Sequence, residues 1–317
     1  MRIAIFGAGG VGGYFGGRLA QAGEDVTFIA RGAHLEAMRA RGLRVDSVAG
    51  DFVLETVQAS DDPAAAGPVD AVLVGVKAWQ VPQAAEAMRP LLGRETFVVP
   101  LQNGVEAPGQ LAALLGREHV VGGLCRIISY VAGPGHICHT GAAPIIIFGE
   151  LDGGASARLQ RLAVACERAA GMTAEIAEDI EAALWRKFLM IATFSGVGAV
   201  TRAPIGVLRS RPETRQMLQA ALQEIYDVAR ARGVRLNTAA LDAATTFMDG
   251  LPTGATASMQ RDILAGRPSE LESQNGAVVR LGEEAGVATP LHRFIYHSLL
   301  PLELRARGEL DFAVAET

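Results

Sequence analysis

Residues 2–12 read Arg-Ile-Ala-Ile-Phe-Gly-Ala-Gly-Gly-Val-Gly. The mostly apolar run over residues 2–6 predicts a short buried strand, and the stretch after the glycines predicts a helix to about Ala22. The glycines between them match G-x-G-x-x-G in the strand-to-helix context that this pattern requires. The stretch therefore predicts an N-terminal Rossmann-type domain that binds a dinucleotide.

Each glycine of this turn has its own physical role. Gly7 allows the tight turn, Gly9 lets the backbone approach a pyrophosphate, and Gly12 lets the helix pack closely on the strand. The start of the helix also offers free N–H groups and the positive end of its dipole to phosphates. The cofactor-binding residues predicted in the turn are Gly7, Ala8, Gly9, Gly10, Val11 and Gly12. The alternative is a glycine-rich helix start that binds no ligand.

The end of the second predicted strand bears on the choice of dinucleotide. NAD-specific sites usually carry Asp or Glu about 20 residues after the glycines, where it binds the ribose hydroxyls. Here residues 25–30 predict the strand, and Arg31 follows it without an acidic residue. The planar guanidinium of Arg31 suits a 2′-phosphate, so the sequence favours NADPH (NADP) over NADH. The alternative is that Arg31 is an ordinary solvated residue.

The rest of the first half alternates strands and helices. Apolar runs over residues 69–76 and 96–101 predict buried parallel strands with a helix over 80–92 between them, and hence a sheet with helices on both faces. Residues 120–131 and 145–148 are expected to form antiparallel hairpins that close this sheet. Further elements are expected over residues 53–58 (strand), 156–170 (helix) and 173–176 (strand).

No strand pattern follows Ile180. Helices are expected over residues 180–200, 213–232, 238–248, 255–266, 269–285 and 290–305. The predicted fold class is therefore α/β, with a Rossmann-type dinucleotide-binding domain over residues 1–177 and an all-helical domain for substrate and dimerisation over 178–317. A homodimer would be compatible with this apolar helical half.

The composition argues against several classes of partner. The 317 residues carry a formal net charge of −5 and no long basic tract, so neither nucleic acid nor membrane is an expected partner. The longest apolar stretch, residues 188–200, is interrupted by polar residues and is shorter than the ~20 residues of a membrane span. The chain begins without a signal-peptide pattern, and its three cysteines are too few for a disulfide framework. A cytoplasmic protein is expected.

One cluster of potential metal ligands is discounted. His136, Cys138 and His139 lie close together, with Cys125 nearby, but their spacing matches no common zinc pattern. No metal site is predicted.

Several further segments, in a fixed order, carry a resemblance to a known family. They are Val-Lys-Ala-Trp-Gln at 76–80, Gln-Asn-Gly at 102–104, Leu-Trp-Arg-Lys at 184–187, Ser-Met-Gln-Arg-Asp-Ile at 258–263, Glu-Leu-Glu at 270–272 and Asn-Gly at 275–276. Together with the first turn they cover nearly the whole chain, which resembles the ketopantoate reductases (2-dehydropantoate 2-reductases). The resemblance implies reduction of the ketone of 2-dehydropantoate to pantoate with NADPH, on the route to pantothenate and coenzyme A.

The resemblance also implies roles for individual residues. Hydride transfer to a ketone leaves charge on the carbonyl oxygen, which a proton donor must meet. Lys187 matches the family's general acid, and Glu270 its catalytic, substrate-binding carboxylate. Asn103, Ser258 and Ser195 match or replace substrate-contacting positions. Contacts with the cofactor are implied for Lys77, Gln80, Asn103 and Glu270.

A structural alternative stands beside each role. Lys187 could reach solvent from an amphipathic helix, and Glu270 could be a first-turn acid after a Ser269 cap. Asn103 before Gly104 is typical of a turn. Ser258 could be an ordinary helix serine, and Lys77 a solvated surface lysine.

The sequence departs from the family pattern at three positions. The best-known members carry Asn four and eight residues after the lysine and three residues before the serine, where this chain has Ile191, Ser195 and Ala255. The pocket is therefore expected to be more apolar than theirs. The alternatives to ketopantoate reduction are a paralogous NADP-dependent reductase of another small 2-oxo acid, a broader 2-hydroxy-acid dehydrogenase, and a non-catalytic NADP-binding sensor.

Overall fold

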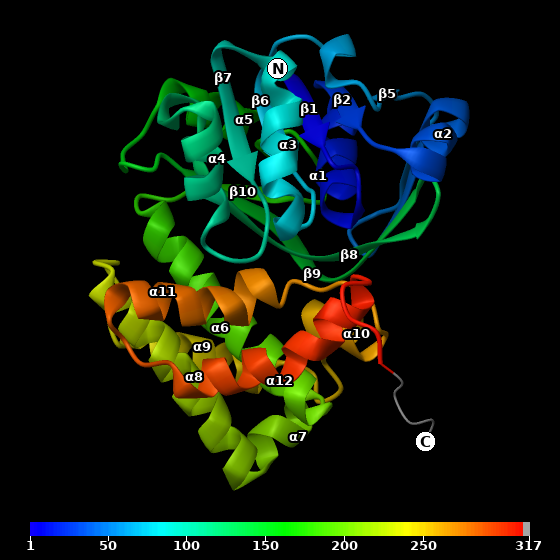
Figure 1. Cartoon of the computed structure of the whole chain (residues 1–317). Helices are drawn as coiled ribbons and strands as arrows, with labels where there is room; N and C mark the ends of the chain where they lie inside the picture. The colour runs from blue at the N-terminus through cyan, green and yellow to red at the C-terminus, as the bar shows by residue number, and fades with distance from the viewer. Residues whose placement is uncertain (313–317) are drawn as a thin grey trace. The chain divides into compact units, whose positions relative to one another are not determined.

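The structure, a computed structural model, describes residues 1–312 except for the side chain of Ala142 (Figure 1). The chain divides into two compact units. The first comprises Met1–Gln102 and Ala107–Ile180, and the second comprises Asn103–Glu106 and Glu181–Thr317. The sequence predicts a single boundary between residues 177 and 178. The structure instead divides the chain after Ile180 and also assigns Asn103–Glu106 to the second unit.

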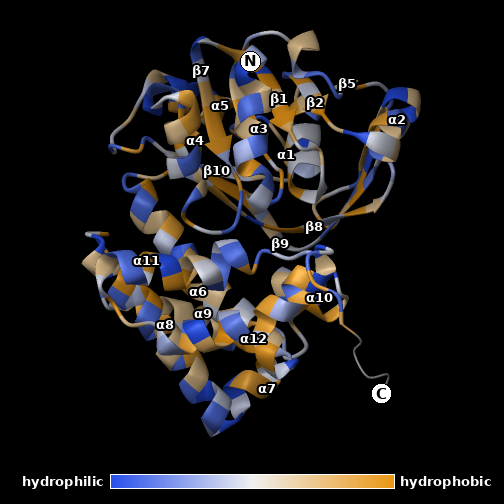
Figure 2. Ribbon diagram, viewed as in Figure 1, coloured by the Kyte–Doolittle hydropathy of each residue, from blue (hydrophilic) through white to orange (hydrophobic). Residues whose placement is uncertain are grey.

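The first unit contains a parallel five-stranded sheet in the order β5-β2-β1-β6-β7. Its strands are β1 (Arg2–Phe6), β2 (Asp25–Ile29), β5 (Gln58–Ser60), β6 (Val69–Val74) and β7 (Leu92–Pro100). Alternate side chains of β1 enter different cores, Ile3 and Ile5 on one face and Ala4 and Phe6 on the other. Figure 2 accordingly colours β1 and β7 as hydrophobic. The predicted parallel sheet, apolar on both faces, is confirmed.

Helices cover both faces of this sheet. They are α1 (Gly10–Gln21), α2 (Gly32–Arg41), α3 (Val81–Met88), α4 (Ala107–Leu115) and α5 (Ala157–Glu167), with short 3-10 turns over Pro63–Ala65, Ala78–Gln80, Arg89–Leu91 and Arg117–His119. Side chains of α3 and α4 pack in the core on one face, and those of α1 and α5 in the core on the other. The sequence analysis missed α2 and α4.

The expectation that hairpins close the first sheet is wrong. The strands β8 (Gly122–Gly133) and β9 (His136–Gly149) do form an antiparallel hairpin, but it belongs to a second sheet with β3 (Leu43–Ser47), β4 (Phe52–Leu54) and β10 (Thr173–Ile176). The reason is the length of β9, which pairs with β3 near its start and with β10 near its end. Helix α1 contacts β2 of the first sheet and β8 and β9 of the second.

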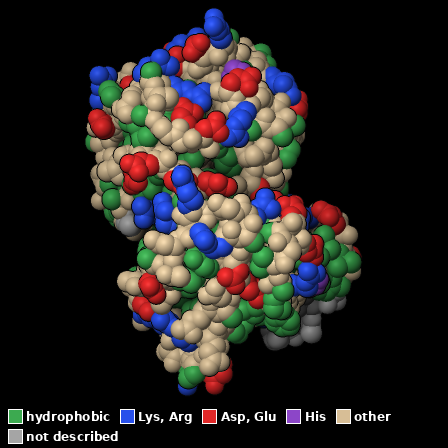
Figure 3. All heavy atoms as spheres, turned by 90° about the vertical axis from the view of Figure 1, so that its left-hand side faces the viewer, with side chains coloured by type: hydrophobic (Ala, Val, Ile, Leu, Met, Phe, Trp, Pro, Cys, Tyr) green, Lys and Arg blue, Asp and Glu red, His purple; other side chains and the backbone are tan. Residues whose placement is uncertain are grey.

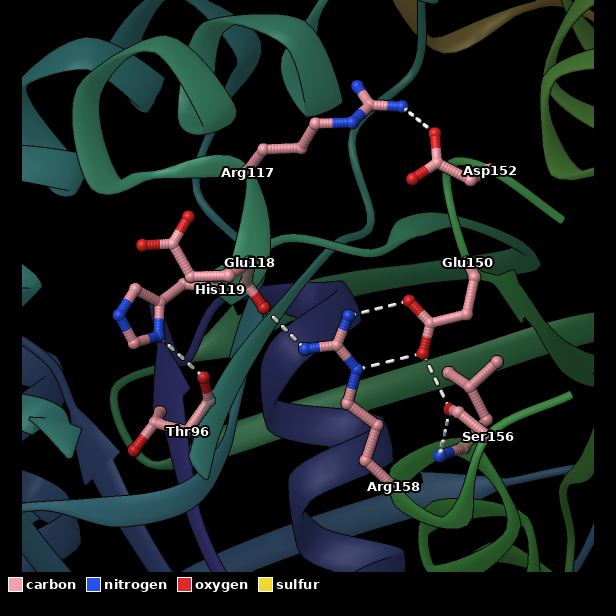
Figure 4. A network of polar contacts seen from close by, with 9 residues as sticks. Thr96, Arg117, Glu118, His119, Glu150, Asp152, Ser156 and Arg158 are labelled. Carbon is pink, nitrogen blue, oxygen red and sulfur yellow. Dashed lines mark hydrogen bonds and ion pairs between the residues drawn. The ribbon is translucent and has the colours of Figure 1, made fainter. Parts of the chain in front are cut away.

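A polar network ties the end of β9 to α5 (Figure 4). The Arg158 guanidinium donates to both Glu150 oxygens, at 2.8 and 2.5 Å, and to the Glu118 carbonyl at 2.5 Å. The Ser156 hydroxyl donates to Glu150 and also caps α5. Hydrogen bonds from Arg158 hold the pKa of Glu150 below its usual range. The network fixes the return of the chain from the second sheet.

Every regular element of the second unit is a helix in the part of the chain that the structure describes. Its elements are α6 (Ile180–Thr201), α7 (Ile205–Ser210), α8 (Pro212–Ala231), α9 (Ala239–Gly250), α10 (Ser258–Leu264), a π-helix (Glu272–Gly276), α11 (Ala277–Ala285) and α12 (Pro290–Ala306). Helix α8 contacts α7, α9, α11 and α12. The helical half is confirmed, but α7 was not expected, and the helix predicted over 269–285 begins with the π-helical turn.

Helix α6 confirms the helix predicted over residues 180–200 and is strongly apolar. An 18-residue window within this 22-residue helix has a mean hydropathy of 1.2, so by length and composition alone the helix could span a membrane. However, 67% of that window is buried inside the protein, as in the core helix of a soluble protein.

On the face drawn in Figure 3, Lys and Arg side chains are interspersed with Asp and Glu.

Candidate functional site

The glycine-rich turn joins β1 to α1 at the carboxyl edge of the first sheet. Gly7 has a φ of +98°, and a Cβ there would lie 2.8 Å from the backbone nitrogen of Val76. A Cβ on Gly12 would lie 2.1 Å from the carbonyl oxygen of Gly7. The fold itself therefore requires both glycines, one for its backbone conformation and one for close packing.

Gly9 differs from its neighbours because the protein gives no reason for it. It is the N-cap of α1 with a φ of −69°, and a Cβ there would meet nothing within 4 Å. Gly10 is packed, since its Cβ would lie 2.6 Å from the carbonyl oxygen of Ser129. Ala8 is buried and Val11 packs partly into the core, so both present mainly backbone. An uncapped helix start beside an open Gly9 fits a pyrophosphate.

Three further cofactor residues predicted from the sequence lie beyond the ends of neighbouring strands. Arg31 follows β2 and is exposed, and within residues 1–312 its guanidinium makes no hydrogen bond or ion pair that the structure records. Lys77 follows β6, with Nζ 5.7 Å from the centroid of the Trp79 ring. The Gln80 side chain accepts the backbone N–H of Lys77 at 3.2 Å and so closes that turn. Because β2, β1 and β6 are adjacent and parallel, these residues and the glycine turn share one sheet edge, where such folds bind nucleotides.

Gln102, which follows β7, connects the end of this strand to the end of β6 by hydrogen bonds. Its amide nitrogen donates to the carbonyl oxygens of Val74 at 2.8 Å and Val76 at 2.9 Å. The chain then enters the second unit at Asn103. The sequence motif that contains these two residues therefore divides between the two units.

Asn103 and Glu270 are brought together although 167 positions separate them. The amide nitrogen of Asn103 donates to a carboxylate oxygen of Glu270 at 3.1 Å. Glu270 is only 6% exposed, and its carbonyl oxygen accepts from the Ser273 hydroxyl and the Gln274 backbone. The pair presents an oriented, largely buried carboxylate.

The segment Asn103–Glu106 is held at its other end as well. A Cβ on Gly104, which has a φ of +104°, would lie 2.8 Å from the Ser273 carbonyl oxygen. Arg280 donates to Glu106 at 2.9 Å and also pairs with Glu272 on the π-helix. Burial raises the pKa of Glu106, and Arg280 offsets part of that rise. The sequence analysis missed these anchors, because nothing local links residue 106 to residue 280.

The remaining predicted residues lie on two other helices of the second unit. Lys187 is half-buried on α6, and Ile191 lies one turn further on the same face. Ser195 is completely buried and donates its hydroxyl to the Ile191 carbonyl, as helix serines often do. A substrate contact for Ser195 stays a prediction, and it would require the hydroxyl to give up this hydrogen bond. Ser258 is the half-buried first residue of α10, three residues after Ala255.

The residues discounted as metal ligands have other partners. His136 bonds to Asp46 at 2.9 Å, and His139 bonds to the Ser47 hydroxyl at 2.8 Å. Across residues 1–312, no group of three or more His, Cys, Asp or Glu side chains is arranged to hold a metal ion.

Comparisons with known proteins match both units. The family model described as ketopantoate reductase PanE/ApbA matches residues 3–153, and the model of its C-terminal part matches residues 179–303. The chain is 32% identical to the uncharacterized oxidoreductase YkpB of Bacillus subtilis, over 94% of this chain and 98% of that protein. It is 30% identical to a 2-dehydropantoate 2-reductase of Mesorhizobium japonicum, over 92% and 94% of the two chains.

Solved structures also resemble this chain over nearly its whole length. A PanE/ApbA family ketopantoate reductase from Ralstonia eutropha has a TM-score of 0.88 at 32% identity, with 97% of this chain and 100% of that chain covered. A D-mandelate dehydrogenase in a ternary structure with NADH and anilino(oxo)acetate has a TM-score of 0.86 at 23% identity, covering 97% and 99% of the chains, which shows a shared fold.

Proposed function

The chain belongs to the ketopantoate reductase family, and we propose that it reduces 2-dehydropantoate (ketopantoate) to pantoate with NADPH. The observation that carries this proposal is the buried Glu270 carboxylate, oriented by the Asn103 amide at 3.1 Å in the same unit as Lys187. An oriented, buried carboxylate suits recognition of a substrate hydroxyl. A coenzyme-binding protein without catalysis has no need of it.

The cofactor is proposed to bind along the carboxyl edge of the first sheet. Residues Gly7–Gly12 would hold the pyrophosphate at the uncapped start of α1, and Arg31 and Lys77 would hold the adenosine end. Gln80, Asn103 and Glu270 are proposed as further contacts. When bound, NADPH supplies the hydride. Fluorescence titration tests the choice of cofactor, with NADPH expected to bind more tightly than NADH and Arg31→Ala expected to reduce that preference.

The proton is proposed to come from Lys187. Its ammonium would donate to the carbonyl oxygen as charge develops there. Glu270 would accept a hydrogen bond from the substrate hydroxyl, while Asn103 holds the carboxylate. Ser258 is proposed to contact the substrate carboxylate.

Lys187→Ala and Lys187→Arg together test this role. Arginine keeps a cation but does not give up a proton near neutral pH. Both variants should bind NADPH and lose turnover, by about 100-fold or more for a lost general acid. Wild-type turnover in Lys187→Ala would refute the assignment. Catalysis in the wild type also separates the reductase from a sensor that only binds NADP.

A second substrate is a specific alternative. Ile191 and Ala255 replace the family's two asparagines, and Ser195 is occupied within its own helix, so fewer polar groups are available than in the best-known members. Another small 2-oxo acid, with an apolar group in place of the hydroxyl, would suit such a pocket. Steady-state kinetics with ketopantoate and a panel of 2-oxo acids decides between them, by the ratio of kcat/KM values.

The proposal extends to a cytoplasmic homodimer. Burial raises the pKa of the Cys166 thiol to about 12 and so makes it unreactive, and a sparse set of three cysteines is compatible with a reducing compartment. Light scattering of the purified protein would measure its oligomeric state.

A further inference from the structure

Ser269, the residue before Glu270, makes three polar contacts with the side chain of Glu303 on α12. The carboxylate of Glu303 accepts the backbone N–H of Ser269 at 3.0 and 3.1 Å, one distance to each oxygen. It also accepts the Ser269 hydroxyl at 2.5 Å. Ser269 is completely buried, and Glu303 is 4% exposed. The residue before Glu270 therefore has little freedom to move.

Two further hydrogen bonds extend this hold to both sides of Glu270. The Ser269 oxygen Oγ accepts the backbone N–H of Leu271 at 3.2 Å. Arg307, the C-cap residue of α12, donates to the Ser269 carbonyl at 3.1 Å and pairs with Glu303 at 2.6 Å. The backbone flanking Glu270 is thus tied to one buried carboxylate. We call Glu303, Ser269 and Arg307 the clamp.

The clamp is costly if it serves stability alone. A carboxylate that leaves water loses its hydration, and well-packed apolar residues usually replace a buried ion pair without loss of stability. The clamp does provide direction, because hydrogen bonds fix the segment that carries Glu270 more specifically than apolar contacts would. Asn103 fixes the carboxylate itself at the other end of the side chain.

We propose that Glu303 is a positioning residue, which acts through Ser269 to orient the Glu270 carboxylate toward the substrate. The inference rests on the function proposed above, since it needs Glu270 to bind the substrate. A carboxylate displaced by about 1 Å can cost up to 100-fold in rate, so the effect should appear in catalysis.

Two variants weaken the clamp in different ways. Glu303→Gln removes the charge at nearly constant shape, and Ser269→Ala removes the hydroxyl without adding volume. Glu224→Gln is the matched control, because the Glu224 carboxylate also accepts two backbone N–H groups, those of Leu291 and His292 at the start of α12. It makes no recorded contact with residues 269–271 in the described chain, so its loss should affect stability only.

The measurements are kcat and KM for the best 2-oxo acid substrate, thermal unfolding, and NADPH titration as a check that the first unit is folded. Both clamp variants should lower kcat/KM by about 10- to 100-fold. Glu224→Gln should lower the unfolding temperature and leave kcat/KM within twofold. Equal losses of activity in all three variants at temperatures where each remains folded would mean that the clamp has no special link to Glu270.

A double-mutant cycle separates this inference from the proposed function. If Glu303 acts through Glu270, adding Glu303→Gln to Glu270→Gln should cause no further loss. Independent, multiplicative losses overturn the positioning role. Wild-type activity in Glu270→Gln alone overturns the role of Glu270 in the proposed function, and the inference with it. Full activity in both clamp variants, with a large loss in Glu270→Gln, overturns the inference only.

Discussion

The starts of α1 and α12 present the same backbone groups and treat them in opposite ways. At α12, the Glu224 carboxylate accepts the N–H groups of Leu291 and His292 at 2.8 and 3.0 Å. At α1, the N-cap is Gly9, and no side chain caps the helix. The first unsatisfied N–H groups of a helix attract an anion in either case. The second unit supplies this anion from its own chain, whereas under the proposed function the first unit takes it from the cofactor's pyrophosphate.

The largest loss of stability is expected for Gly12→Ala, which disrupts the packing of the first turn of α1 against the glycine turn. A methyl group 2.1 Å from the Gly7 carbonyl oxygen forces the helix away from the strand. Overpacking of this kind should cost about 3 kcal/mol of unfolding free energy, and NADPH binding should be lost with it. Denaturant unfolding measures the change, and an unchanged midpoint would contradict this packing argument.

A smaller loss of stability is expected when the charge of Glu224, which accepts the first N–H groups of α12, is removed. Glu224→Gln keeps one acceptor but removes the charge that faces two backbone N–H groups and the His292 ring at 2.8 Å. The unfolding free energy should fall by about 2 kcal/mol, as for other charge-assisted hydrogen bonds. NADPH affinity should stay the same, because the first unit contributes the proposed pyrophosphate contacts. A fall in affinity as large as that in Gly12→Ala would undermine the contrast between the two helices.

Gly9→Ala at the uncapped start of α1 should weaken ligand binding without changing the stability of the fold. The added methyl group meets no protein atom within 4 Å, so the unfolding free energy should change by less than about 1 kcal/mol. A phosphate approaching the backbone would meet it, and NADPH should bind about tenfold more weakly, or about 1.4 kcal/mol. Titration and thermal unfolding on one preparation give both numbers. Unchanged affinity would place the phosphates elsewhere.

The smallest effect concerns pH. Burial raises the pKa of Glu224, but hydrogen bonds from the side chain and backbone of His292 and from Leu291 outweigh it, so the pKa lies below its ordinary value of 4.5. Stability from a lowered carboxyl pKa is fully present above that ordinary value and disappears as the pH falls through the lowered one. The difference in unfolding free energy between wild type and Glu224→Gln should therefore be constant above about pH 5 and shrink below pH 4. A difference that grows toward acid pH would contradict the lowered pKa of Glu224.

The sequence predicted best what depends on neighbouring residues. The glycine turn, β1 and β10 follow from short local patterns, and the alternating buried faces of β1 follow from an apolar run. The second sheet was missed because β9 pairs with β3 across about 90 residues, and no local signal selects that partner. Local patterns describe elements, while pairings between distant segments decide how those elements assemble.

The same limit applies to the candidate site. The roles of Lys187, Asn103 and Glu270 came from a resemblance, and the structure added the hydrogen bond between the last two. The burial of Ser195 could not be read from its motif, and neither could the hold of Glu303 on Ser269. Both depend on which side chains meet across helices, which no spacing along the chain reveals.

The short excursion of Asn103–Glu106 into the second unit also sets an order of events during synthesis. Asn103 leaves the ribosome 167 residues before Glu270, its hydrogen-bond partner. At about 5–20 residues per second, the segment waits roughly 8–30 seconds for that partner to be made. The first unit therefore has to complete its sheet around a loop whose contacts do not yet exist, and the nascent chain gains its oriented carboxylate only as the last helices emerge.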